Sequence, residues 1–197
     1  GRVEFIGQPI AIVVARTRDA ARRAAKKAKF DIVEEKPILT IDEAIAANSL
    51  LKPPTIIERG APANALANAT HKLHGESSIG AQEHFYLEGQ IALAIPHEDG
   101  QMQVIVSTQH PTEMQQVVAT ILGIGWNDVA SEVRRLVGGF GGKEVQPAQF
   151  AALAALAAHH TGCPVKIRLD RDDDFLITGK RHDFAFHYDA ASDANGR

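Results

Sequence analysis

Hydrophobic and polar positions along this chain follow two periodicities in turn, which predicts short strands separated by helices. An apolar run at 10–15 indicates a buried strand. Alanines recur at helical spacing over 17–29, with arginine and lysine on the other side, and Thr17 suits the cap of that helix. A second strand is predicted at 30–35 and a short helix at 41–47.

From 48 to about 70 the chain is irregular, interrupted by Pro53, Pro54, Gly60 and Pro62, and after it the same order returns. The periodicity predicts an α+β fold built from strand–helix units, with 57–70 as a connector between regions 1–56 and 71–197. Strands are predicted at 71–80, 84–96, 102–106, 129–137 and 164–169 and from 184, and helices at 112–122 and 147–161 and from 170.

Glycine is most dense just before the alanine-rich helix at 147–161, where four of the five residues from 138 to 142 are glycine. Glycine inside an element costs about 0.5–1 kcal/mol relative to alanine, but it allows positive φ and close approach of the backbone to another group. The loop also precedes a helix N-terminus, which favours anions. It is therefore predicted to face an anion or cofactor, with a glycine turn kept only for packing as the alternative.

Neither common phosphate motif fits this loop. A P-loop has glycine where Val137 stands and serine or threonine where Glu144 stands, and the dinucleotide fingerprint would also need glycine at 144.

Three further motifs accompany the loop. Residues 82–88 read QEHFYLE, residues 107–110 read STQH, and residues 176–182 read LITGKRH. In this order, the four motifs resemble the molybdenum-cofactor-binding subunit of the xanthine dehydrogenase/aldehyde oxidase family. The resemblance covers nearly the whole chain. It implies that 1–56 is the C-terminal part of an α/β hammerhead domain and that 71–197 is the first part of the molybdopterin-binding domain.

The resemblance also assigns roles to particular residues. Without it, Gln109 is a turn-stabilising amide and Glu144 a helix-start glutamate that the dipole stabilises. The resemblance implies that Gln109 binds an oxygen of the molybdenum centre and that Gly139, Phe140 and Gly141 face the cofactor. Glu144 would contact a purine, since aldehyde-oxidising members typically have no carboxylate there.

The reaction implied is oxidation of hypoxanthine and xanthine to urate, with oxygen from water. Electrons would pass through 2Fe-2S clusters and FAD to NAD, on partner domains or subunits of a homodimeric enzyme. The family's catalytic glutamate lies outside these residues, so no catalytic residue is expected here and the chain alone is expected to be inactive. The alternatives are an aldehyde oxidase-like hydroxylase and a non-catalytic anion- or nucleotide-binding module.

Composition narrows the class of protein. The 45% hydrophobic and 23% charged residues are typical of a globular protein, and a net charge of −3 argues against nucleic-acid binding. No apolar run reaches the roughly 18 residues of a membrane span, and a cytoplasmic enzyme is expected. Cys163 is the only cysteine, which excludes an internal disulfide or an iron–sulfur cluster. His84 and His110 lack zinc-site spacing, so no protein metal ligand is expected. The chain lacks an initiator methionine and ends in a turn-like sequence, which suggests a fragment of a longer polypeptide.

Overall fold

The structure, a computed structural model, describes residues 1–196 of the 197-residue chain. It contains both helices and sheets, which confirms the predicted α+β class. The helices are α1 (Arg18–Ala25), α2 (Ile41–Ala46), α3 (Pro62–Asn68), α4 (Pro111–Leu122), α5 (Gln146–Thr161) and α6 (Arg171–Ile177). The strands are β1 (His71–Ile79), β2 (Ile91–Pro96), β3 (Met102–Val106), β4 (Val129–Glu132), β5 (Val165–Arg168) and β6 (Phe184–Ser192). Two 3₁₀ turns, η1 (Glu98–Gly100) and η2 (Trp126–Asp128), precede β3 and β4.

The chain folds into two compact units, each made from two separate stretches. The first unit contains 1–29 and 82–181, and the second contains 30–81 and the residues from His182 onward. The predicted domain division at 57–70 stays a prediction, because these compact units are defined by contacts within this chain and not by the domains of a longer protein.

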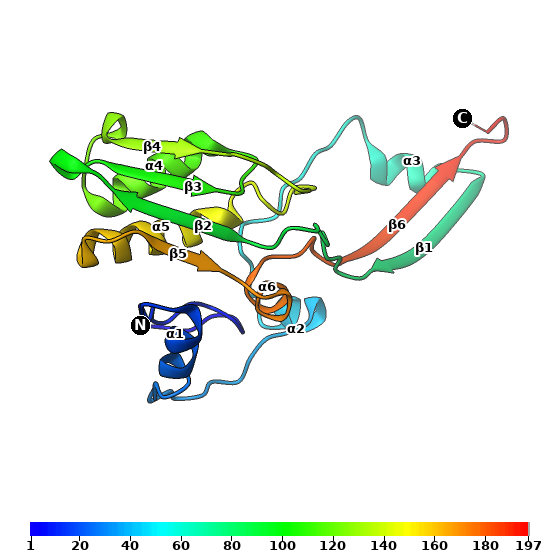
Figure 1. Cartoon of the computed structure of the whole chain (residues 1–197). Coiled ribbons are helices and arrows are strands. Elements are labelled where there is room, and N and C mark those ends of the chain that lie inside the picture. The colour runs from blue at the N-terminus through cyan, green and yellow to red at the C-terminus, as the bar shows by residue number, and fades with distance from the viewer. Residues whose placement is uncertain (197) are drawn as a thin grey trace. The chain divides into compact units, whose positions relative to one another are not determined.

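A four-stranded sheet in the order β4-β3-β2-β5 organises the first unit (Figure 1). β2 is antiparallel to both β3 and β5, whereas β3 and β4 are parallel. A parallel pair needs a crossover connection, and α4 supplies it between these two strands. The segments that follow β3 and β4 therefore leave the same edge of the sheet.

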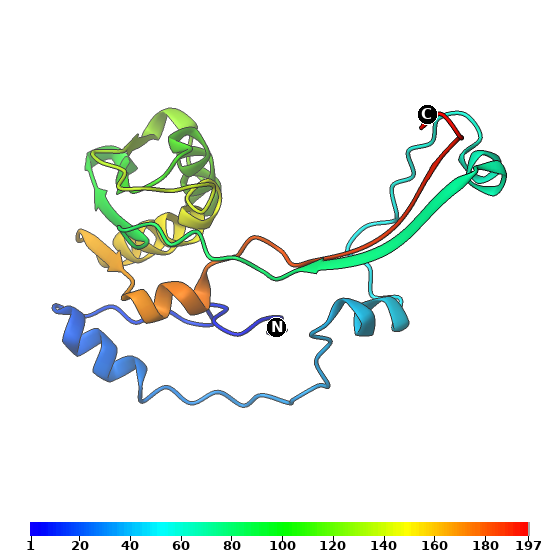
Figure 2. The same ribbon diagram turned by 90° about the vertical axis from the view of Figure 1, so that its right-hand side faces the viewer.

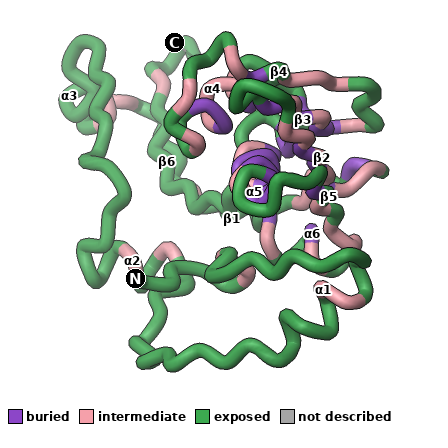
Figure 3. Tube along the Cα trace, turned by 60° about the vertical axis from the view of Figure 1, so that its left-hand side comes forward, coloured by how far each residue is buried: buried purple, intermediate pink, exposed green. Residues whose placement is uncertain are grey.

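The core lies between this sheet and helices α4 and α5, where the burial in Figure 3 is concentrated. Alternate residues of β3 point into it, and Val104 is fully buried there with Met114 and Val118 of α4. Burying each such side chain contributes about 1.5–3 kcal/mol. α5 adds mainly alanines to this core. The core thus holds the ends of β3 and β4 and the start of α5 in a fixed arrangement.

The second unit is a long two-stranded ribbon with two short helices (Figure 2). β1 and β6 pair antiparallel from His71↔Ser192 to Ile79↔Phe184, and α3 contacts β6. Nearly all residues of the ribbon are exposed. Two strands without a covering layer bury little apolar area, so this unit has little core of its own.

Several predicted elements are confirmed. α1 begins after Thr17, whose hydroxyl accepts a hydrogen bond from the Ala20 amide. The strand predicted at 102–106 and the helix that follows it are also present, although α4 begins at Pro111 after His110, not after Thr112.

Other predicted elements are wrong or shorter. Residues 10–15 and 30–35 form no strand in the described part of the chain, because an apolar run becomes a strand only where another strand hydrogen-bonds to it. Val33 is 93% exposed. The strands predicted at 84–96 and 129–137 are present only as β2 and β4. The connector holds a helix, α3, in which Pro62 occupies an N-terminal position where its missing N–H costs nothing.

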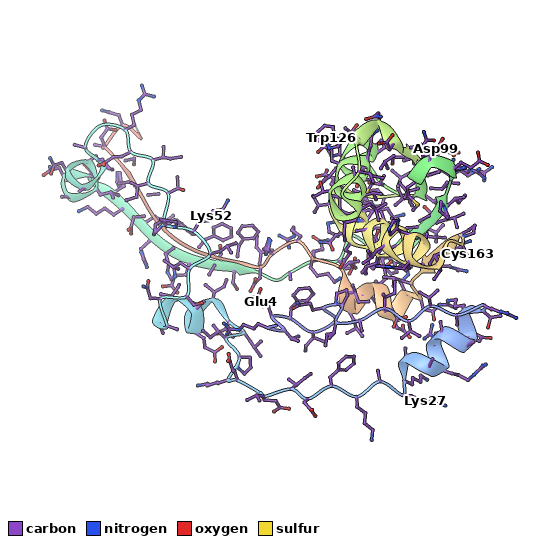
Figure 4. All side chains as sticks on the ribbon, turned by 90° about the vertical axis from the view of Figure 1, so that its left-hand side faces the viewer. Glu4, Lys27, Lys52, Asp99, Trp126 and Cys163 are labelled. Atoms are coloured by element: carbon purple, nitrogen blue, oxygen red, sulfur yellow. The ribbon has the colours of Figure 1, made fainter. Side chains whose placement is uncertain are left out.

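Outside this framework, Cys163 follows the C-terminal end of α5 as an exposed free thiol (Figure 4). Over residues 1–196, none of the helices combines the length and apolar character needed to cross a membrane.

Candidate functional site

The glycine loop follows β4 and leads directly into α5, so it lies where β3 and β4 both end. Phe140 and Gly141 have φ of 53° and 88°, in the left-handed region. Glycine enters that region freely, whereas a bulky residue such as Phe140 does so at a cost and needs surrounding contacts to hold it. The Gly142 amide donates to the Gly139 carbonyl over 2.7 Å, which closes a turn around them. Phe140, at the tip, is 76% exposed.

Gln109, which follows β3, contacts this loop through its backbone and its side chain. Its backbone N–H donates to the Lys143 backbone carbonyl over 2.7 Å. Its side-chain Oε1 accepts hydrogen bonds from the Gly141 N–H at 3.0 Å and the Lys143 N–H at 3.2 Å. A Cβ on Gly139 would lie 2.4 Å from the same Oε1, so only glycine allows this approach.

These contacts set the direction of the Gln109 amide. Two N–H donors meet the same atom, and only the oxygen end of a carboxamide can accept them. The NH₂ end therefore points away from the loop backbone, and among residues 1–196 it has no hydrogen-bond acceptor. The result is an exposed, uncharged donor group of fixed direction.

Beneath the loop lies a buried lysine. The Lys143 side chain is fully buried, and its ammonium lies 3.2 Å from Glu88 Oε2 and 2.9 Å from Ser107 Oγ. It also lies 4.8 Å from the centre of the Tyr86 ring, within cation–π range. The Ser107 hydroxyl donates to Glu88 Oε2 over 2.6 Å, which completes a triangle of polar groups.

The net effect of burial and of the contacts within this triangle is a lowered pKa for both ionisable groups, Lys143 and Glu88. Burial lowers the pKa of Lys143, although the neighbouring Glu88 carboxylate partly opposes that effect. Partial burial acts to raise the pKa of Glu88, but hydrogen bonds from Ser107 and Lys143, with the lysine charge, hold it below its ordinary value. A carboxylate with a lowered pKa stays ionised at neutral pH, so Glu88 gives the Lys143 ammonium a charged partner. The Lys143 side chain is fully buried, whereas the Glu88 side chain is 32% exposed.

A second buried cluster supports the other side of the loop. The Tyr86 hydroxyl donates to Asp174 Oδ1 over 2.7 Å, and the Gln90 backbone N–H donates to Asp174 Oδ2 over 2.8 Å. Gln90 Nε2 donates to the Tyr86 hydroxyl and, over 3.1 Å, to the Gly142 carbonyl. Burial, together with the bond to Asp174, raises the pKa of Tyr86 to about 12. This cluster ties α6 and the start of β2 to the loop.

Glu144 lies at the exit of the loop, two residues before the first residue of α5. Its side chain is exposed, and among residues 1–196 it forms no hydrogen bond or ion pair. It therefore precedes the first helical turn, which weakens its interpretation as a helix-start glutamate. The structure brings Gly139 and Gly141 against the Gln109 side chain, whereas the Phe140 and Glu144 side chains are exposed on the same loop.

Of the supporting residues, Glu88 is expected from the QEHFYLE motif to support the cofactor cleft structurally, whereas the sequence does not predict Lys143, Tyr86 or Asp174 as part of the site. One signal was available, because a lysine flanked by glycine and glutamate is unusual in a packed turn. Its burial depends on Glu88, 55 positions earlier in the sequence. In the described part of the chain, no three His, Cys, Asp or Glu side chains are grouped to hold a metal ion.

Comparison with known proteins gives one family match. The molybdopterin cofactor-binding domain family matches residues 48–197. The chain is 43% identical over 196 residues to the xanthine dehydrogenase/oxidase of Gallus gallus, covering 99% of this chain and 14% of that protein. It is 42% identical over 198 residues to aldehyde oxidase 2 of Rattus norvegicus, covering 100% of this chain and 15% of that protein.

A solved structure shares the fold. Quinoline 2-oxidoreductase from Pseudomonas putida 86 matches with a TM-score of 0.82 and 23% identity, over 93% of this chain and 24% of that one. The loop and its supporting clusters thus belong to a fold found in much longer proteins.

Proposed function

Because this chain belongs to the molybdopterin cofactor-binding domain family of xanthine dehydrogenases and aldehyde oxidases, we propose that it supplies part of the cofactor site of a purine-oxidising molybdenum hydroxylase. The single observation that carries the proposal is the Gln109 amide, whose oxygen is held by two loop N–H groups and whose NH₂ group is left exposed. The complete enzyme would oxidise hypoxanthine and xanthine to urate.

The residues present fit such a group. A molybdenum centre held by its pterin would need no protein metal ligands, and this site offers it an uncharged NH₂ donor and exposed backbone. Gln109 would donate to an oxygen of the centre, and Phe140 and Gly141 would line it with exposed backbone. Gly139 is buried and would contribute by leaving room for the Gln109 side chain. When bound, the cofactor supplies the oxidising power of the reaction. FAD, 2Fe-2S clusters and NAD would be bound by partner domains of a homodimeric enzyme.

Glu144 supports a purine over an aldehyde as the substrate. It is exposed beside the loop and has no protein partner among residues 1–196, so its carboxylate is free to accept from ring N–H groups. Xanthine carries such N–H groups and a simple aldehyde carries none. The similarity to an aldehyde oxidase at 42% identity makes aldehyde oxidation the second candidate.

The test is steady-state oxidation of xanthine and of an aromatic aldehyde by the full-length protein with its partner domains, comparing wild type with Glu144→Gln. Glu144→Gln removes one acceptor charge without changing size, so xanthine kcat/KM should fall about 10–100-fold, while aldehyde oxidation and molybdenum content stay unchanged. Glu98→Gln is the matched control, an exposed glutamate before β3, at the strand end opposite Gln109. Unchanged xanthine kcat/KM in Glu144→Gln would contradict the purine assignment and favour the aldehyde.

A further inference from the structure

Glu88 contacts both ends of the glycine loop. At the entry, its backbone N–H donates to the Val137 carbonyl over 3.3 Å, and its Oε2 accepts from the Val137 N–H at 3.4 Å. At the exit, the same Oε2 accepts from the Lys143 ammonium. One carboxylate therefore joins the two points between which the four glycines run.

Lys143 connects this carboxylate to Gln109. Its ammonium binds Glu88 and Ser107, while its carbonyl accepts from the Gln109 N–H and from the Thr108 hydroxyl at 3.1 Å. Its own N–H donates to Gln109 Oε1. Displacement of Lys143 would therefore remove one of the two donors that fix the Gln109 amide and would shift the other, on Gly141.

We propose that Glu88 and Lys143 form a clamp, an ion pair between a partly exposed carboxylate and a buried ammonium, which fixes both ends of the glycine loop and thereby the direction of the Gln109 NH₂ group. The two are positioning residues, since they would act on the cofactor only through Gln109. The clamp itself follows from contacts within this chain. Its effect on catalysis rests on the proposed function, in which the Gln109 NH₂ meets the cofactor.

Apolar packing could not fix the position of this loop. Four glycines contribute no side chains to pack, and Phe140 points outward, so the loop is held mainly by polar contacts. A buried ion pair often stabilises a fold less than apolar residues of the same size, but it demands one geometry. The clamp therefore controls loop position more than overall stability.

The test is hydrogen–deuterium exchange of peptides spanning 137–146 in the full-length protein. Lys143→Met and Glu88→Gln should each speed exchange of these peptides about tenfold, the effect expected from losing hydrogen bonds to a charged group. Glu88→Gln keeps an acceptor for Ser107 and Val137, so it carries the test if Lys143→Met fails to fold. Lys166→Met, an exposed lysine of β5, is the matched control and should exchange as wild type does.

The neutral pair Glu88→Gln with Lys143→Met separates positioning from stability. It leaves no unpaired charge, so its unfolding temperature should recover towards wild type, while exchange stays fast and xanthine kcat stays low with KM and molybdenum content little changed. Wild-type exchange and kcat in this double variant would overturn the clamp. Accelerated exchange in a protein that does not oxidise xanthine even as wild type would support the clamp and refute the proposed function.

Discussion

Replacing Gln109 by glutamate or by alanine separates two roles that the structure gives this residue. The oxygen end accepts from the Gly141 and Lys143 N–H groups, and the NH₂ end is free to donate outward. Glutamate keeps the accepting oxygen and removes the donor. Alanine removes both. Alanine should therefore destabilise the protein and glutamate should not, whereas both substitutions should impair catalysis.

The magnitudes follow from these bonds. Gln109→Ala loses two accepted hydrogen bonds of about 0.5–1.5 kcal/mol each, so the free energy of unfolding should fall by about 1–3 kcal/mol. Gln109→Glu keeps both bonds, and its stability should stay within about 1 kcal/mol of wild type. Loss of one donor that stabilises developing charge lowers kcat by about 10²–10³-fold, and both variants should show that loss.

The assays are denaturant unfolding and steady-state xanthine oxidation by the full-length protein, with molybdenum measured on each preparation. Gln101→Glu makes the same chemical change at an exposed glutamine before β3 and serves as the control. Normal xanthine turnover by Gln109→Glu with molybdenum bound would refute the donor role. Equal stability of Gln109→Ala and wild type would refute the structural role of the oxygen.

Three further predictions concern stability. The folded-state pKa of Glu88 lies below its ordinary value, so its contribution to the free energy of unfolding is present above about pH 4.3 and is lost as pH falls. In Glu88→Gln, the free energy of unfolding should therefore fall less steeply with decreasing pH than in wild type. The pKa of Tyr86 is raised to about 12, so its contribution is lost as pH rises from about 10 towards 12. Tyr86→Phe should lack that alkaline loss and, because Asp174 loses a donor, should be about 1–3 kcal/mol less stable at neutral pH. Gly139→Ala places a methyl group 2.4 Å from Gln109 Oε1, so thermal unfolding should occur earlier and xanthine turnover should fall, whereas an unchanged unfolding temperature would show that the loop can shift.

Local pattern predicts the part of this fold that packs on itself. The strand at 102–106, the helix after it and the alanine-rich helix at 147–161 carry their own periodicity and bury it against each other, and all three are confirmed. The runs at 10–15 and 30–35 carry a similar apolar signal, but no described segment pairs with them. Whether an apolar run becomes a strand depends on a neighbour that its own sequence does not contain.

The site also has a part that the sequence predicts and a part that only the folded structure shows. Glycine density identifies the loop locally. Gln109 is identified only by the family resemblance to which the STQH motif contributes, because its local pattern indicates a turn-stabilising amide. Glu88 belongs to the QEHFYLE motif and is expected to support the cleft, but the sequence does not show which residues it contacts. Its role appears only when folding brings Lys143 and Val137 to it from about 50 positions away.

The buried charges beneath the loop explain why an exposed, glycine-rich segment can hold one conformation. Chain entropy favours disorder in such a segment by about 1–2 kcal/mol per residue, and apolar burial supplies little opposition. Glu88 accepts a hydrogen bond from the Val137 N–H at the entry of the loop, and Gln109 accepts one from the Lys143 N–H at its exit. Gln90 donates to the carbonyl of Gly142, the last glycine. Each is anchored in the sheet or just beyond a strand end, so the rigidity of the core reaches the loop. A loop held at three points from below keeps its upper face free for a ligand, which is the arrangement that binding without prior rearrangement requires.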